Sequence, residues 1–336
     1  KDAALANLVG SILTNGKAGL IDLNLVKKQK LLKASAYSYL LVDHGLLYIS
    51  ASPSQGQSLE DVKKLVLNEI ENLKKGNFDD DLIPSIVNNI KKHKIQQTES
   101  YGDRAYMLMD AFTGKLNWRD QVAYVNDLSK VTKKDIMDFA NKYFGNNYVA
   151  VLKHKGERTD IEKIEKPTIT PVETNADKQS AFVKMINQMP STPVAPVFLD
   201  YNKDLQRSKL GKAEVYYVQN KENQLYRLNF RYKIGTLNDL KMGLAAQYIQ
   251  FLGTDKKSAE QISKEFYKIA SSFRVHTADE YTFVTIEGLQ ENFEAAVTLY
   301  ENLIQNLKAD EQALEALKAR IQKYRSDVKA NRNQIM

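Results

Sequence analysis

The chain has 336 residues, enough for two domains of ordinary size, each with its own buried core. Apolar residues make up 43% and charged residues 26%, a composition typical of a globular protein. No run of about 18 apolar residues occurs, so the sequence predicts no hydrophobic transmembrane helix. The absence of cysteine excludes disulfides, thiolate zinc sites and cysteine nucleophiles, although it does not fix the compartment.

The net charge of +7 raises the question of a polyanionic partner such as a nucleic acid. However, the lysines come as pairs on expected helix faces, with acidic residues close by: Lys63-Lys64, Lys74-Lys75, Lys91-Lys92 and Lys133-Lys134. Aromatic residues do not interleave with these basic residues in the way that stacks bases. The pattern indicates solvated helix surfaces and predicts no nucleic-acid partner.

The chain opens with KDAALANLVG, which lacks an initiator Met, a basic n-region and a long apolar h-region. We therefore expect a processed or excised segment without its targeting signal. The residues themselves leave the localisation unknown.

The first region, residues 1–155, is predicted to be α+β. Its apolar spacing indicates helices over 3–13 and 20–30, then a hairpin of strands 34–42 and 46–52. Ser58 is the expected N-cap of the next helix. Three further helices (80–98, 101–112, 132–143) and a closing strand (148–154) complete the region.

A proline-rich segment, residues 156–210, separates this region from the next. Proline fixes φ and removes a backbone donor, so we expect an extended linker, interrupted by a short helix near 180–187. Five of the seven prolines lie in this segment: Pro167, Pro171, Pro190, Pro193 and Pro196.

The second region, residues 211–336, is also predicted to be α+β. Strands 213–220 and 224–234 precede helices 238–251 and 258–270; a hairpin (273–277, 281–287) and two long helices from Asn292 follow. Residues 282–325 repeat the plan of residues 47–94: a strand, a polar turn, an amphipathic helix, an acidic turn and a basic helix. This echo predicts a duplication.

Within the second region, residues 243–254 read GLAAQYIQFLGT and resemble the metal-binding helix of the pitrilysin/insulinase family of zinc metallopeptidases, the inverzincins. Active members carry H-x-x-E-H on this helix. The two His bind Zn²⁺, the Glu takes a proton from the zinc-bound water, and a later Glu completes the site. Here Gly235-Thr236, Gly243-Leu244-Ala245 and Gly253-Thr254 match the residues that frame the motif.

The catalytic positions of the motif have lost their chemistry. On this resemblance, Ala246 and Gln250 occupy the positions of the two zinc-binding His, and Ile249 occupies that of the general base. Neither Ala nor Ile can bind a metal or move a proton. We therefore expect no catalytic residue and no metal ligand in this chain, with zinc present only in the missing N-terminal domain of the parent protein.

The later zinc-binding Glu is also missing. Its position falls near Lys323 or Tyr324, and Asp327 is the only acid between residues 316 and 336. Lys323 or Tyr324 is expected to reach the Gln250 amide and fill the former metal pocket with a packed helix–helix contact. A substrate-clamping Arg and Tyr of the family have no counterpart at Lys27 and Ala34, the comparable positions.

The resemblance also implies an organisation. Family members consist of two homologous halves of two domains each, with LuxS/mitochondrial-processing-peptidase-like folds in which helices cover one face of a largely antiparallel sheet. Residues 1–155 then correspond to the second domain of the N-terminal half without its first strand or so. Residues 156–210 correspond to the linker between halves, and residues 211–336 to the truncated first domain of the inactive half.

The function implied is that of a non-catalytic middle fragment of a pitrilysin-type zinc peptidase, which degrades or processes peptides or unfolded proteins in a chamber between its halves. The alternative is part of a wholly non-catalytic family member that serves as scaffold or partner subunit of an active peptidase. A generic α+β binding module is the third possibility. The resemblance allows a bacterial periplasm or cell envelope as the location.

Other candidate sites have simpler interpretations. Residues 14–19, TNGKAG, lack the G-x-x-x-x-G-K-S/T spacing of a phosphate loop and are expected to form a turn between helices. The four histidines, His44, His93, His154 and His276, are too scattered for a helical metal site and are expected at the surface or in turns.

Overall fold

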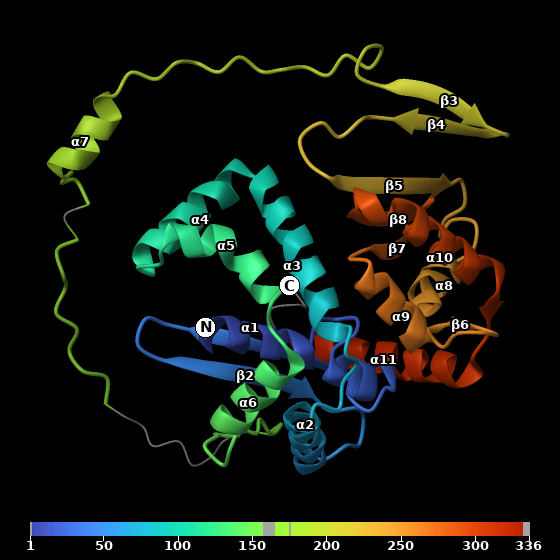
Figure 1. The fold of residues 1–336 in the computed structure, drawn as a ribbon, viewed down its shortest axis with the longest axis horizontal. Helices are drawn as coiled ribbons and strands as arrows, with labels where there is room; N and C mark the ends of the chain where they lie inside the picture. Colours follow the sequence, from blue (N-terminus) through green and yellow to red (C-terminus); the bar gives the residue numbers. More distant parts are fainter. Residues whose placement is uncertain (1, 157–164, 175, 332–336) are drawn as a thin grey trace. The chain divides into compact units, whose positions relative to one another are not determined.

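The computed structural model describes residues 2–156, 165–174 and 176–331 (Figure 1). The chain forms two compact units. One combines Lys1–Val151 with Asn220–Met336, and the other is Leu152–Gln219. The two regions that the sequence separates by a linker therefore pack together in one unit.

The first part of the larger unit is mostly helical, with one β-hairpin. Its elements are α1 (Asp2–Leu13), a π-helical turn (Asp22–Lys27), β1 (Lys33–Leu40), β2 (Gly45–Ser52), α2 (Leu59–Lys74), α3 (Leu82–Glu99), α4 (Tyr101–Thr113), α5 (Trp118–Leu128) and α6 (Lys133–Tyr143). Strands β1 and β2 pair antiparallel from Lys33↔Ser52 to Leu40↔Gly45, as the hairpin prediction required. The apolar faces of α1, α2, α3 and α6 meet in one core that includes Leu8, Ile12, Leu73, Ile86 and Ile136.

Two expectations for this part are wrong, and one helix was not predicted. Residues 148–154 form no strand, and the side chains of Val149 and Val151 are 90% and 88% exposed. A strand forms only where a neighbouring strand bonds to its backbone groups, and among the described residues none pairs with this segment. In place of the helix expected over 20–30, the structure has only the π-helical turn Asp22–Lys27. The backbone of Gln29 has a φ of 56°, which a continuing helix could not contain. Helix α5, capped by the Asn117 side chain, was not predicted.

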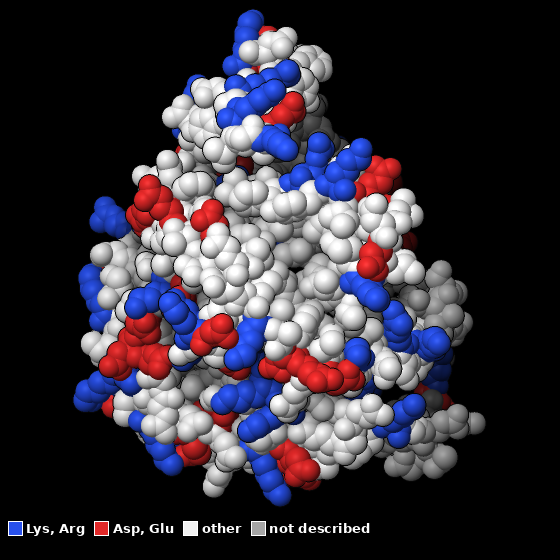
Figure 2. Space-filling view, turned by 90° about the vertical axis from the view of Figure 1, so that its right-hand side faces the viewer, with Lys and Arg blue, Asp and Glu red and all other residues white. Residues whose placement is uncertain are grey.

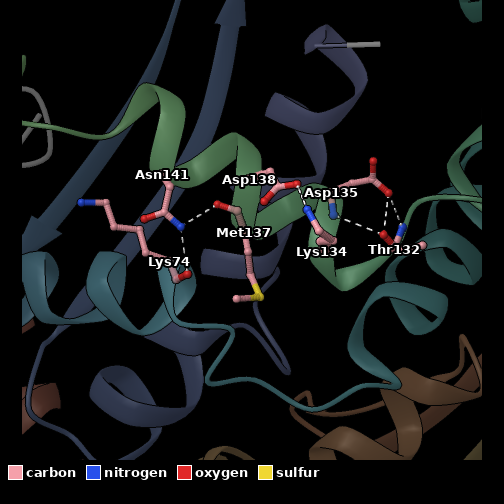
Figure 3. Close-up of polar contacts among 7 residues, drawn as sticks. All are labelled: Lys74, Thr132, Lys134, Asp135, Met137, Asp138 and Asn141. Carbon is pink, nitrogen blue, oxygen red and sulfur yellow. Dashed lines mark hydrogen bonds and ion pairs between the residues drawn. The ribbon is translucent and has the colours of Figure 1, made fainter.

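Helix α6 shows how local capping and tertiary contacts combine (Figure 3). The Thr132 hydroxyl accepts from the Asp135 backbone N–H, and the Asp135 carboxylate accepts from the Thr132 N–H, which is a capping box. Farther along, Asn141 Nδ2 donates to the backbone oxygens of Met137 (2.9 Å) and Lys74 (3.1 Å). The second bond holds α6 against the end of α2.

The second part of the larger unit has a three-stranded sheet as its centre. Its elements are β5 (Leu225–Tyr232), α8 (Met242–Tyr248), a 3₁₀ turn (Ile249–Phe251), β6 (Gly253–Thr254), α9 (Ala259–Lys268), β7 (Ser272–Thr277), β8 (Thr282–Leu289), a 3₁₀ turn (Gln290–Asn292), α10 (Phe293–Gln305), β9 (Leu307–Lys308) and α11 (Glu311–Lys329). The strand order is β5-β8-β7, and both pairs are antiparallel. Side chains of α9 and α10, including Ile262, Phe266 and Tyr300, pack against Val284 and Ile286 of β8. The α+β prediction is confirmed.

The two parts of this unit share a buried contact between α3 and α9. Tyr267 belongs to the same apolar cluster as the residues of α1 and α3, and Asn89 Nδ2 donates to the Tyr267 carbonyl oxygen at 2.7 Å. Ion pairs flank the contact: Lys264 with Asp79 at 2.5 Å and Lys268 with Asp81 at 2.9 Å. The contact therefore fixes the first part of the unit beside the β5-β8-β7 sheet of the second part.

The element order of the predicted echo is present in both parts. In the first, β2 is followed by α2 and α3; in the second, β8 is followed by α10 and α11. Each leading strand is the second strand of an antiparallel hairpin. A common origin of the two parts stays a prediction.

The smaller unit contains helix α7 (Ala181–Gln188) and the antiparallel pair β3 (Gln206–Leu210) and β4 (Ala213–Tyr217). Helix α7 agrees with the short helix expected near 180–187. All five prolines of the proposed linker lie in described segments without helix or strand. Residues 157–164 and 175 of that linker lie outside the described part of the chain.

The surface agrees with the interpretation of the lysine pairs. Each of the four pairs has a member in an ion pair: Lys63–Glu60 (3.6 Å), Lys74–Glu71 (2.8 Å), Lys91–Glu291 (3.7 Å) and Lys133–Asp80 (2.7 Å). On the face drawn in Figure 2, basic side chains lie among acidic ones. Within the described residues, no helix combines the length and apolar character needed to cross a bilayer.

Candidate functional site: a cavity beside helix α8

The family-like stretch of residues 243–254 covers most of α8, the following 3₁₀ turn and β6. Two of the three framing glycines, Gly235 and Gly253, have a packing reason. A Cβ on Gly235 would lie 2.4 Å from the Ala278 carbonyl oxygen, and one on Gly253 would lie 2.5 Å from the Lys257 carbonyl oxygen. These positions need glycine because backbone segments approach closely there, whether or not a metal is bound.

Helix α8 is shorter than the predicted helix over 238–251. Its α-helical part is Met242–Tyr248, so Ala246 lies in the helix whereas Ile249 and Gln250 lie in the 3₁₀ turn. The residues before α8 are held instead by long-range backbone hydrogen bonds to the turn of the β7–β8 hairpin. Thr236 N–H donates to the Ala278 oxygen and Leu237 N–H donates to the Asp279 oxygen.

Ala246, Ile249 and Gln250 all line one cavity of about 660 Å³. The size is in the range of about 300–1,000 Å³ that small-molecule sites occupy. A packed helix–helix contact was expected here, whereas the structure has an open cavity in its place.

Lys323 and Tyr324, the residues expected to fill this space, are not among the lining residues. Lys323 Nζ pairs with Asp327 one turn along the same helix at 2.8 Å, and Tyr324 is 62% exposed. Helix α11 instead meets α8 at its own first turn, where the Tyr248 hydroxyl bonds to the backbone oxygen (2.6 Å) and N–H (2.8 Å) of Asp310. The contact therefore fixes the helices without closing the cavity.

The residue that reaches Gln250 is Lys27, from the π-helical turn of the first part. Lys27 Nζ donates to the Gln250 backbone oxygen at 3.0 Å and lies 5.5 Å from the centre of the Phe251 ring. A cation at the last carbonyl groups of a helix is favourable, because these groups carry the negative end of the helix dipole. From the sequence, Lys27 was noted only because it stands where the family has a substrate-clamping Arg. The residues around Lys27 do not indicate its contact with Gln250.

One wall of the cavity is the polar face of the sheet. The strand register places Arg227, Glu287 and Ser272 in one row across β5, β8 and β7, and Asn229, Thr285 and Arg274 in the next. All six line the cavity. Glu287 accepts from Arg227, with 3.2 Å between its Oε2 and the nearer guanidinium nitrogen. Phe273 and Val275, from the other face of β7, also line it, so the cavity runs along the β7 edge of the sheet.

Lys17 reaches the cavity from a loop built around a buried carboxylate. Asp22 Oδ2 accepts backbone N–H bonds from Asn15 (2.6 Å), Gly16 (2.7 Å) and Gly19 (3.3 Å). Burial raises the pKa of Asp22, although these hydrogen bonds act to lower it. The loop is the turn predicted for residues 14–19, and the Ser263 hydroxyl fastens it to α9 through the Lys17 backbone oxygen at 2.9 Å.

Burial, with a smaller effect of neighbouring cations, lowers the pKa values of two lysines at the cavity. Burial, followed by the neighbouring Lys17, lowers the pKa of Lys27 to about 8. Burial, followed by the neighbouring Arg274, lowers the pKa of Lys17. The Lys17 side chain is exposed to solvent, but many protein atoms lie around it. These atoms displace part of the water that would stabilise its charge, and this lowers its pKa.

The site does not suit zinc. Catalytic zinc takes three protein ligands, usually His, Glu, Asp or Cys. In the described part of the chain, no group of three or more such side chains lies close enough together to hold a metal ion. The only acid that lines the cavity among the described residues is Glu287, which is paired with Arg227.

Comparisons with known proteins give a family for the last part of the chain and a similar fold for most of it. Residues 243–336 match the family model described as Insulinase (Peptidase family M16). No curated protein matches the chain. Among solved structures, pitrilysin is 15% identical over 98% of this chain and 36% of its own length, with a TM-score of 0.51.

Two other solved structures are similar to parts or most of the chain. A protease from Helicobacter pylori is 25% identical over 44% of this chain and 35% of its own length, with a TM-score of 0.41. The ferredoxin protease FusC, solved with Arabidopsis ferredoxin, is 14% identical over 94% of this chain and 38% of its own length, with a TM-score of 0.34. The chain spans little more than a third of the length of these proteins: 35% of the Helicobacter pylori protease, 36% of pitrilysin and 38% of FusC. Residues 243–336 thus belong with the insulinase family, peptidase family M16, and the fold of nearly the whole chain is similar to that of pitrilysin.

Proposed function

We propose that this chain is a non-catalytic section of a pitrilysin-type zinc peptidase and forms part of the wall of its peptide chamber. The observation that carries the proposal is the cavity beside α8. The positions that bear H-x-x-E-H in active relatives, Ala246, Ile249 and Gln250, face this cavity and offer no metal ligand or base. The chemistry would then belong to zinc bound elsewhere in the parent protein.

The smaller unit, Leu152–Gln219, would connect the two halves of the parent in this proposal. Its prolines favour extended backbone, and its described residues have few regular elements. Such a segment can serve as a hinge while the folded parts stay intact. Peptides or unfolded proteins would be the substrates of the parent, as the family membership suggests.

The test uses the chain of residues 1–336 after purification and dialysis against a chelator, followed by excess zinc and desalting. We expect far less than one zinc per chain by mass spectrometry of metals, and no cleavage of quenched fluorescent peptides. Pitrilysin treated in the same way is the positive control. One tightly held zinc per chain, or cleavage that a chelator abolishes, would contradict the proposal.

A second measurement separates this role from that of a scaffold subunit. We expect the complete parent protein to bind zinc and to cleave peptides through a site outside this chain. A parent with neither property would instead be a wholly non-catalytic family member.

A further inference from the structure

The cavity beside α8 collects positive charge from four separate elements. Lys17 comes from the loop after α1, Lys27 from the π-helical turn, Arg227 from β5 and Arg274 from β7. Glu287 neutralises Arg227. Among the described residues, no hydrogen bond or ion pair is found for the Lys17 ammonium or the Arg274 guanidinium, and Lys27 has only the neutral Gln250 carbonyl oxygen at 3.0 Å.

The fold keeps these cations together against their repulsion. Lys17 is held through the loop around Asp22, and the Ser263 hydroxyl bonds to the Lys17 backbone at 2.9 Å. Asp22 itself is occupied by backbone N–H groups, and Glu260, which also attracts Lys27, does not line the cavity. Lys17, Lys27 and Arg274 therefore line one cavity in which the described residues offer them no acidic partner. An anion bound there would be stabilised by ion pairs with these three side chains.

Apolar side chains lie in the same cavity as the cations. The lining includes Ile249 from the 3₁₀ turn after α8 and Leu252 next to that turn, together with Phe266 from α9 and Phe273 from β7. A small inorganic anion would leave this apolar surface in contact with water. An acidic peptide can pair carboxylates with the cations and cover the apolar surface with neighbouring side chains.

We propose that this cavity binds an acidic peptide segment, with carboxylates at Lys17, Lys27 and Arg274 and apolar side chains against Ile249, Leu252 and Phe266. The choice of a peptide rests on the proposed function as a chamber wall. The former metal-binding helix would thus have become part of a peptide-binding surface selective for acidic sequences.

The test is calorimetric titration of the full chain with two amidated peptides, Leu-Glu-Phe-Glu-Leu and the same sequence with Gln in place of both Glu. We expect the acidic peptide to bind at least about tenfold more tightly, the effect of one charged hydrogen bond. Equal affinities would overturn the inference. This outcome differs from failure of the proposed function, which zinc content and cleavage reveal.

A pair of charge-matched variants tests the location. Lys17→Gln with Lys27→Gln should weaken the acidic peptide by about tenfold or more, whereas Lys28→Gln with Lys30→Gln should leave its affinity nearly unchanged. Lys28 and Lys30 are exposed, follow the same turn and do not line the cavity. Equal losses in both variants would show general charge attraction and overturn the site.

Two further arms complete the design. Arg274→Gln, on the exposed face of its strand, gives an independent loss of affinity if the double variant does not fold as judged by circular dichroism. Inorganic phosphate is titrated as a competitor. Displacement of the acidic peptide by an equal concentration of phosphate would indicate a free-anion site and overturn the choice of a peptide.

Discussion

Asn89 in α3 donates a hydrogen bond from Nδ2 to the backbone oxygen of Tyr267 in α9 at 2.7 Å, across 178 positions of sequence. The same amide donates to the Ser85 oxygen at 2.9 Å. Asn89 is 7% exposed and Tyr267 is 8% exposed, so the bond lies inside the contact between the two parts of the larger unit. That contact places Lys17 and Lys27 beside the sheet, and the cavity depends on it.

Asn89→Ala should lower the free energy of unfolding by about 1–3 kcal/mol, because two buried carbonyl oxygens lose a donor. Asn89→Asp should be worse at neutral pH, because a buried carboxylate would face the same oxygens without a donor. Burial would raise the folded-state pKa of this new Asp, so its stability deficit should shrink as pH falls. Urea unfolding at several pH values measures both effects.

Asn88→Ala is the matched control for this prediction, since Asn88 is the exposed neighbour on the same helix. It should change the unfolding free energy by less than about 0.5 kcal/mol. If Asn88→Ala and Asn89→Ala destabilised the chain equally, loss of helix propensity would explain the result and the buried bond would not.

The second prediction concerns the pH dependence that Lys27 gives to stability. Its pKa falls from 10.5 to about 8 on folding, so between these values the unfolded state binds more protons than the folded state. The contribution of Lys27 to stability therefore rises with pH through this window. Lys27→Met removes the effect.

The difference in unfolding free energy between the wild-type chain and Lys27→Met should consequently shift in favour of the wild type from pH 7.5 to pH 9.5. Comparison with the variant cancels the contributions of the other ionisable groups. Lys28→Met, at an exposed lysine, serves as the control and should track the wild type. A pH-independent difference for Lys27→Met would disprove the lowered pKa.

The third prediction compares two glycines with left-handed backbone. Gly56 has a φ of 76° and Gly76 a φ of 70°, but only at Gly76 would a Cβ meet another residue, Met137 Sδ at 2.7 Å. Gly56→Ala should cost about 1 kcal/mol for the conformation alone. Gly76→Ala should cost more, because Met137 must also move. Equal losses in thermal unfolding would mean that the α2–α6 contact yields without strain.

The fourth prediction concerns restoration of zinc ligands. Ala246→His with Gln250→His should not create a tight zinc site, because the third ligand and the base are still missing. Position 250 also lies in the 3₁₀ turn, where residues four apart do not align as they do in an α-helix. Equilibrium dialysis with zinc should show no stoichiometric tight binding by the double variant. Tight binding would reveal a third ligand supplied by the fold.

Local sequence determined most of the helices and the hairpins, because their signals act over a few residues. Ser58 accepts from the Asp61 N–H and starts α2, as its position before an apolar period predicted, and Ser258 caps α9 in the same manner. The resemblance predicts a motif without metal ligands from single positions, since Ala246 and Ile249 cannot bind a metal or move a proton in any fold. Composition at single positions suffices for such exclusions.

Only the tertiary structure decided what surrounds Ala246, Ile249 and Gln250. Residues 148–154 have strand-like alternation, but a strand forms only where another strand accepts its hydrogen bonds. Lys323 was expected to reach Gln250 because the resemblance places the later zinc ligand near it, but Lys323 pairs with Asp327 of its own helix. Lys17, Lys27 and Arg274 meet at one cavity because α3 packs on α9, and a contact between residues so far apart in sequence depends on the folded core as a whole.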